Sequence, residues 1–273
     1  MMDWLSHPAI QSGLAPFCAA LIVAFLFDRI RLSGLAILAG FCTTVYLVAD
    51  FNFESLSATK KIMLTGIVAG AIAPVLSVLP SHWRMVGYLL GVSAAAVTLW
   101  VFWPILIQKD VTESLVLGTG LALFVMWQVV LIDGLSSQPV RAGAVGLGMG
   151  VGVGFSALLG ASALLGQLGL AIGAASGAYL LLQLLQNKPL SCGRTLTLPV
   201  SLLSALLAGA ALVLAKLPWY CLPVLALVPL SVYLPVMQKK SCRMQVVGFS
   251  LITMAVAIAA AGLAWYAEGA MTV

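Results

Sequence analysis

The sequence predicts an all-α integral membrane protein, a polytopic bundle of about ten transmembrane helices in five hairpins with a weak internal or inverted repeat. Of its 273 residues, 62% are hydrophobic and only 8% are charged, and the mean hydropathy is +1.13. Soluble domains carry about 25% charged residues. Because so much apolar surface needs a bilayer rather than water, we expect residues 1–273 to form a single transmembrane domain without a soluble domain.

Polar breaks divide the chain into ten apolar segments, each near the length of about 20 residues that a helix needs to cross a bilayer. The predicted spans are 8–27, 34–50, 62–80, 85–107, 114–132, 142–163, 166–186, 196–215, 218–237 and 245–266. The weakest boundary separates the sixth and seventh spans, where two shorter or re-entrant helices are an alternative. The N-terminus carries no Lys or Arg before the first span, so we expect that span to be retained rather than cleaved as a signal.

The basic residues divide unevenly between alternate loops. Nine of the 13, including every arginine, fall on one side: Arg29, Arg31, Arg84, Arg141, Lys188, Arg194, Lys239, Lys240 and Arg243. The other side holds Lys60, Lys61, Lys109 and Lys216. The positive-inside rule then places the five hairpin turns in the cytoplasm and both termini outside, and the compact loops suggest the periplasmic side of a bacterial inner membrane.

Two kinds of internal repeat fit the sequence. The arginines of the inner turns recur at similar intervals, which either a duplicated hairpin or the simple length of two spans explains. The third and fourth spans also resemble the sixth and seventh in the placement of small residues. These pairs enter the membrane from opposite sides, as inverted repeats do.

Glycine and proline mark the sixth, seventh and ninth spans. Glycines recur every four residues in the sixth and seventh spans, at Gly146, Gly150, Gly154, Gly169, Gly173 and Gly177. This spacing predicts close helix packing, and a broken sixth helix lining a site is the alternative. Pro223 and Pro229 predict a kink in the ninth span, so these prolines and glycines are also the candidate hinges.

Charged and metal-binding chemistry is sparse. All eight carboxylates fall at predicted span ends or in loops, and Asp133 is interpreted as a solvated charge at a helix end. The five cysteines have no metal-site spacing, and His7 and His82 fall on opposite sides of the membrane. We therefore expect no cofactor, no metal site and no enzymatic activity. The basic residues form no block, so we expect no nucleic-acid partner.

Uncharged polar residues within the spans are the remaining candidates for solute contact. Gln128 beside Trp127 is the first choice, because an amide next to a ring suits a neutral or zwitterionic ligand. Tyr46, Thr43 and Ser93 complete the candidate substrate-binding set. At any one position, a hydrogen bond between helices is the stronger interpretation.

These features favour a transporter or exporter of a small neutral, zwitterionic or amphipathic solute that works by alternating access. In size and number of spans the chain is similar to the drug/metabolite transporter superfamily, which would imply a substrate site between two inverted halves of five spans. We find no residue motif of that family in the sequence. A non-catalytic subunit of a respiratory or biosynthetic membrane complex is the alternative, and a lipid flippase or scramblase is a further one. The expected partners are the lipid bilayer and either other membrane subunits or a second copy of the chain.

Overall fold

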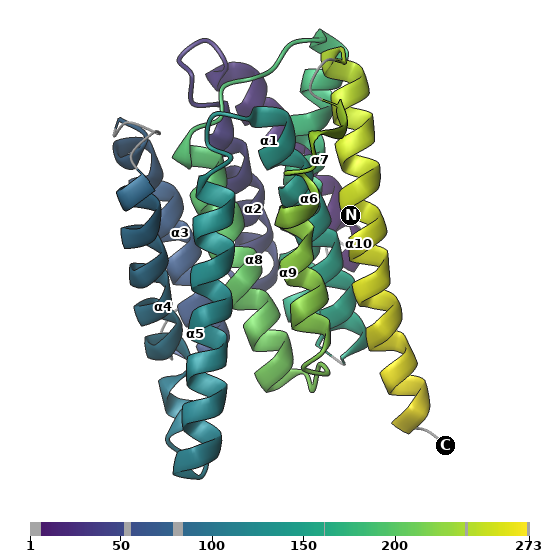
Figure 1. The fold of residues 1–273 in the computed structure, drawn as a ribbon. Helices are drawn as coiled ribbons and strands as arrows, with labels where there is room; N and C mark the ends of the chain where they lie inside the picture. The colour runs from purple at the N-terminus through teal and green to yellow at the C-terminus, as the bar shows by residue number, and fades with distance from the viewer. Residues whose placement is uncertain (1–6, 52–55, 79–83, 161, 238–239, 272–273) are drawn as a thin grey trace.

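The computed structural model describes residues 7–51, 56–78, 84–160, 162–237 and 240–271, which form ten α-helices and no strand (Figure 1). The helices are α1 (Ala15–Phe27), α2 (Ala36–Ala49), α3 (Ala58–Leu76), α4 (Arg84–Leu106), α5 (Val111–Asp133), α6 (Pro139–Leu159), α7 (Ala163–Gln186), α8 (Arg194–Leu214), α9 (Cys221–Ser231) and α10 (Cys242–Met271). A π-helical segment, Ile10–Leu14, leads into α1, and a 3-10 turn, Ser33–Leu35, leads into α2. Asp3, Glu54, His82 and Lys239 lie outside the described residues.

Eight of these helices are long and apolar enough to cross a membrane, α1 being counted with its π-helical segment. The protein is therefore a multi-pass integral membrane protein, as the composition predicts. The other two, α2 and α9, are shorter apolar helices, so the number of ten spans stays a prediction. The helices α6 and α7 are both full-length, and the alternative of two re-entrant helices does not match them.

The proline-rich segment forms a shorter helix than the predicted span 218–237. Helix α9 begins at Cys221 and ends at Ser231, two residues after Pro229. The chain continues into a 3-10 turn, Pro235–Met237. A proline in a helix removes one backbone hydrogen bond and crowds the preceding turn. Here the helix ends soon after Pro229 instead of continuing to residue 237.

Helix α8 lies at the centre of the bundle, packed against α2, α3, α5, α6 and α7 (Figure 1). Every residue from Arg194 to Ala211 is buried. A helix that is buried on all sides has no face of its own to present to lipid. By contrast, α4, α5 and α10 expose large apolar side chains along much of their length, as helices next to lipid do.

The glycines of α6 and α7 lie where these two helices cross. A β-carbon on Gly150 would be 2.2 Å from the backbone nitrogen of Gly173, and one on Gly169 would be 2.7 Å from the Cα of Gly154. Gly146 faces Ser176 in the same interface, whereas Gly177 has looser surroundings. Only residues without a side chain permit this approach, so the stripes serve helix packing here and α6 is continuous.

The inverted-repeat pairs do not pack alike. Helices α6 and α7 are in close contact along their length, whereas α3 and α4 barely touch and α4 packs on α5 instead. The similar placement of small residues therefore does not correspond to similar packing.

The C-terminal ends of α1, α3, α5, α7 and α9 and the N-terminal ends of α2, α4, α6, α8 and α10 all lie at one end of the bundle, at the top in Figure 1. We call it the arginine-rich end, because every arginine of the chain lies there. The α4–α5 hairpin and the C-terminal part of α10 extend to the opposite end.

Candidate functional site

Gln128 and Trp127 point in different directions. The Gln128 side chain is fully buried, and its Nε2 donates to the backbone oxygen of Leu225 in α9 at 3.3 Å and approaches the Sδ of Met149 in α6 at 3.8 Å. Its Oε1 has no hydrogen-bond partner among the described residues. The Trp127 side chain is 47% exposed, on the outside of the bundle. The amide and the ring therefore do not form one binding surface.

Of the other three candidate residues, Thr43 and Tyr46 lie one turn apart on α2, and Ser93 lies on α4. Tyr46 is 57% exposed, and its ring lies 5.9 Å from that of Phe51. The Thr43 hydroxyl donates to the carbonyl oxygen of Ala39 in its own helix, at 2.8 Å. Ser93 is exposed on α4. The five sequence-predicted residues thus do not converge on a common cavity.

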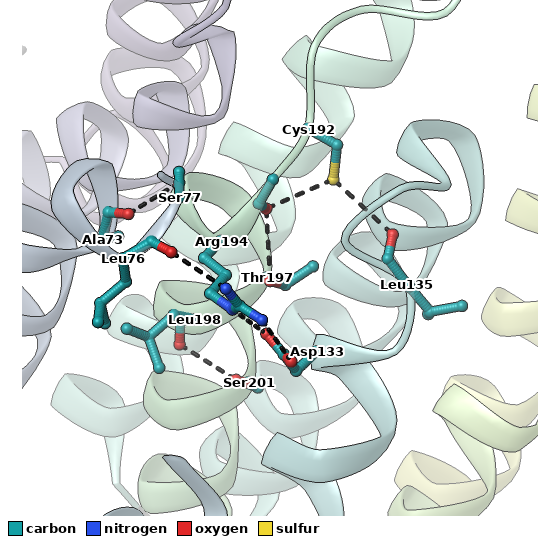
Figure 2. Close-up of polar contacts among 11 residues, drawn as sticks. Ala73, Leu76, Ser77, Asp133, Leu135, Cys192, Arg194, Thr197, Leu198 and Ser201 are labelled. Atoms are coloured by element: carbon teal, nitrogen blue, oxygen red, sulfur yellow. Dashed lines mark hydrogen bonds and ion pairs between the residues drawn. The ribbon is translucent and has the colours of Figure 1, made fainter. Parts of the chain in front are cut away.

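The most polar buried group of the bundle is an ion pair between Arg194 and Asp133. Arg194 begins α8 and is 1% exposed, and Asp133 ends α5 and is 7% exposed. The Arg194 Nε donates to Asp133 Oδ1 at 2.9 Å, and Nη2 lies 3.5 Å from Oδ2 (Figure 2). Arg194 Nη1 donates to the carbonyl oxygen of Leu76, at the end of α3, at 3.1 Å. One guanidinium therefore joins α8, α5 and α3.

This pair corrects two sequence-based interpretations. Asp133 is not a solvated terminal charge, and Arg194 is not a loop cation. Ionisable groups within membrane bundles are costly and usually mark function. Two sequence signals point to the pair. Arg194 is followed directly by a long apolar run that is interrupted only by Ser and Thr, and Asp133 directly follows an apolar run without a polar spacer.

Each charge lies at the unfavourable end of its own helix. A helix carries partial positive charge at its N-terminus and partial negative charge at its C-terminus, so Arg194 and Asp133 each oppose the dipole of the helix that holds them. The carboxylate of Asp133, however, lies next to the N-terminus of α8, where an anion is stabilised. The unfavourable interaction of each residue with the dipole of its own helix is therefore offset only while α5 and α8 stay together.

Two glycines make room for this arrangement. Gly193 precedes α8 with a φ of +70°, a left-handed conformation that glycine adopts without strain, and its N–H donates to the carbonyl oxygen of Ser136. On α4, a β-carbon at Gly87 would lie 3.0 Å from the Oδ2 of Asp133. The carboxylate thus occupies space that a side chain at position 87 would crowd.

The α7–α8 connection is fastened to the same end of the bundle. The hydroxyls of Ser33 and Tyr179 both donate to the carbonyl oxygen of Ser191, each at 2.8 Å. The neighbouring Cys192 is buried, and its Sγ lies 3.9 Å from the carbonyl oxygen of Leu135. Burial raises the pKa of the Cys192 thiol to about 12. This segment is therefore held in place and keeps its thiol protonated.

A row of hydroxyls follows Arg194 along α8. Thr197, Ser201 and Ser204 are spaced by four and three residues, which places them on the face of the helix that also carries Arg194. Figure 2 draws the first two. Each hydroxyl donates to a carbonyl oxygen of its own chain three or four residues earlier. All three are buried, so a polar face without a solvent contact runs from the ion pair into the centre of the bundle.

Other buried polar atoms lack partners. Within the described residues, the hydroxyls of Ser156 and Ser176 and both polar atoms of the Gln183 amide make no hydrogen bond. No group of three or more His, Cys, Asp or Glu side chains in that part of the chain is arranged to hold a metal ion.

Comparisons with protein-family models and with curated proteins gave no match to this chain.

Proposed function

We propose that the protein is a transporter or exporter of a small neutral, zwitterionic or amphipathic solute, and that the Arg194–Asp133 pair holds the cytoplasmic end of its bundle closed. In this proposal the arginine-rich end faces the cytoplasm of a bacterial inner membrane, and both termini lie on the periplasmic side. The ion pair is the observation on which the proposal rests. It joins three helices at one end of the bundle, where its separation would open the buried hydroxyl face of α8.

The unpartnered buried polar atoms support a second conformation. A buried polar group without a hydrogen bond costs about 1–3 kcal/mol. Gln128 Oε1, Ser156 and Gln183 contribute such groups on three different helices. A bundle that opens to water or to a polar solute would satisfy them. Alternating access requires two such states. Transport of this kind makes and breaks no covalent bond, so the proposal assigns no enzymatic activity.

Cysteine accessibility tests whether the hydroxyl face opens. In a background with the five native cysteines replaced by alanine, Ser201→Cys would be treated with a membrane-impermeant thiol reagent in inside-out membrane vesicles. Ala210→Cys, buried on the opposite side of α8, is the matched control. We expect labelling of Ser201→Cys and none of Ala210→Cys. The added change Asp133→Asn should accelerate labelling at position 201 alone.

A non-catalytic membrane subunit is the second candidate, because the centre of the bundle is solidly packed around α8. It predicts that both introduced cysteines stay unlabelled with and without Asp133→Asn. It also predicts that other chains co-purify in fixed ratio from native membranes in mild detergent. Lipid scrambling is less well supported, since two lateral grooves among the described residues have mainly apolar linings. One lies between α3, α4 and α8, and the other lies between α5, α8 and α9.

A further inference from the structure

A second polar feature lies at the arginine-rich end, away from the Arg194–Asp133 pair. A cavity of about 480 Å³ opens between the start of α6, the first turns of α10 and the α7–α8 connection. Gln138 and Arg141 line it from α6, Gln245 and Phe249 from α10, and Pro189 from the connection. Its volume is within the range of about 300–1,000 Å³ that small-molecule sites occupy.

Arg141 is held in a fixed position in the cavity wall. Its Nη1 donates to Gln138 Oε1 at 2.6 Å, and its guanidinium carbon lies 5.0 Å from the centre of the Phe249 ring. Phe249 is itself buried, so the guanidinium is supported on one face and tethered at one edge. These two contacts leave most of its N–H donors unused.

No carboxylate of the described residues pairs with Arg141. The ion pairs found there join Lys109 to Glu113, Lys188 to Asp28, and Arg194 to Asp133. The start of α6 adds positive potential to the cavity, because the backbone N–H groups that follow Pro139 receive no side-chain cap from Gln138. An oriented arginine without a counter-ion, in an open cavity, is suited to bind an anion.

We propose that this cavity binds a phosphate group through Arg141. The planar guanidinium presents paired N–H donors that match phosphate oxygens, and Gln245 lines the cavity from the α10 side. The phosphate has two sources, the headgroup of an anionic phospholipid at the membrane surface or a free phosphate-bearing solute. Basic cavities between helices at the cytoplasmic surface suit anionic headgroups. The inference does not depend on the protein being a transporter.

Lipid nanodiscs separate the two sources. Wild-type protein would be placed in discs of phosphatidylcholine alone and in discs that also contain phosphatidylglycerol, and its thermal unfolding midpoint would be measured. Bound phospholipid would be counted by native mass spectrometry. A higher midpoint and retained lipid only with phosphatidylglycerol identify a headgroup site. A higher midpoint when inorganic phosphate is added to phosphatidylcholine discs identifies a soluble ligand. No response to either anion overturns the proposal.

The variant Arg141→Gln removes the charge and keeps a polar side chain. We expect this variant to bind the anion about tenfold or more weakly, since a charge-assisted bidentate contact is lost. The concentration of anion that raises the unfolding midpoint should increase by the same factor. The matched control is Lys240→Gln, which removes one exposed cation at the same end from a side chain that does not line the cavity. An equal effect of both variants would mean diffuse attraction to the basic surface and would refute a site. If Arg141→Gln does not fold, Gln245→Glu is the second test. It places a carboxylate in the cavity wall and should weaken anion binding, and unchanged binding would also refute the proposal.

Discussion

Removing one charge of the Arg194–Asp133 pair should destabilise the protein far more than removing both. The change Asp133→Leu leaves the guanidinium of Arg194 buried without its carboxylate. The change Arg194→Met leaves the carboxylate in the same position. The double variant leaves neither charge and fills the space with apolar side chains of similar size.

The magnitudes follow from the geometry. At the 2.9 Å separation of Nε and Oδ1, Coulomb's law with an effective dielectric constant of about 20 gives an attraction of about 6 kcal/mol. The loss of hydration costs several kcal/mol for each ion and offsets most of that attraction. We therefore expect a cost of about 3–5 kcal/mol for each single variant, and a double variant within about 1 kcal/mol of wild type or more stable.

Unfolding by sodium dodecyl sulfate from mixed micelles, followed by circular dichroism, measures these free energies in a double-mutant cycle. The coupling energy should be large because both residues act in one contact. A control charge removal at the exposed Lys109–Glu113 pair should cost less than about 1 kcal/mol. Single variants that cost no more than this control would show that water reaches the Arg194–Asp133 pair, and would remove the basis for a closed end.

Further predictions concern the α6–α7 interface and the α7–α8 connection. Burial raises the pKa of the Cys192 thiol from 9.0 to about 12, so at pH 8 its thiolate fraction should be about a thousandth of that of an ordinary cysteine and a maleimide should label it slowly. Since this pKa is raised on folding, the stability that it contributes is present below pH 9 and is lost as the pH rises from 9 to about 12, which unfolding curves at several pH values would detect. Gly150→Ala places a methyl group against the backbone of Gly173 and should lower the free energy of unfolding by about 1–3 kcal/mol. Gly120→Ala, with nothing within 4 Å of its new β-carbon, should be neutral or slightly stabilising. Equal free energies of unfolding for the two variants would contradict the close crossing of α6 and α7. Tyr179→Phe removes the bond to the Ser191 carbonyl and should cost about 1 kcal/mol in the same detergent titration.

Composition and the length of apolar runs predict the fold class, because every segment that crosses the bilayer must be apolar and must satisfy its backbone hydrogen bonds within the protein. The glycine spacing likewise predicts close packing, and Gly150 and Gly173 lie at a helix crossing. The ends of the proline-rich helix are not predictable in this way. Several prolines fall in that segment, and the sequence alone does not say which of them ends the helix, which stops at Ser231, two residues after Pro229.

The polar site is harder to predict, because packing, rather than distance along the chain, decides which side chains of two helices face each other. Gln128 and Trp127 are neighbours in sequence, yet one faces the centre and the other faces outward. Asp133 and Arg194 are 61 residues apart and meet. A sequence places both at span ends, where most charges are solvated, and only the crossing of α5 with α8 decides that these two are not.

The depth of the pair decides whether it can act as a reversible closure. A charge stranded at the bilayer centre is so costly that an ion pair there would rarely separate. Asp133 is the last residue of α5 and Arg194 the first of α8, so both lie where helices leave the apolar core. When α5 and α8 part at this end, water can solvate each charge, and the cost of opening approaches the net strength of the pair rather than the cost of an unpaired buried ion. Because the hydration cost offsets most of the Coulomb attraction, that net strength is a few kcal/mol. A difference of this size between two conformations is one that the binding of a solute can overcome.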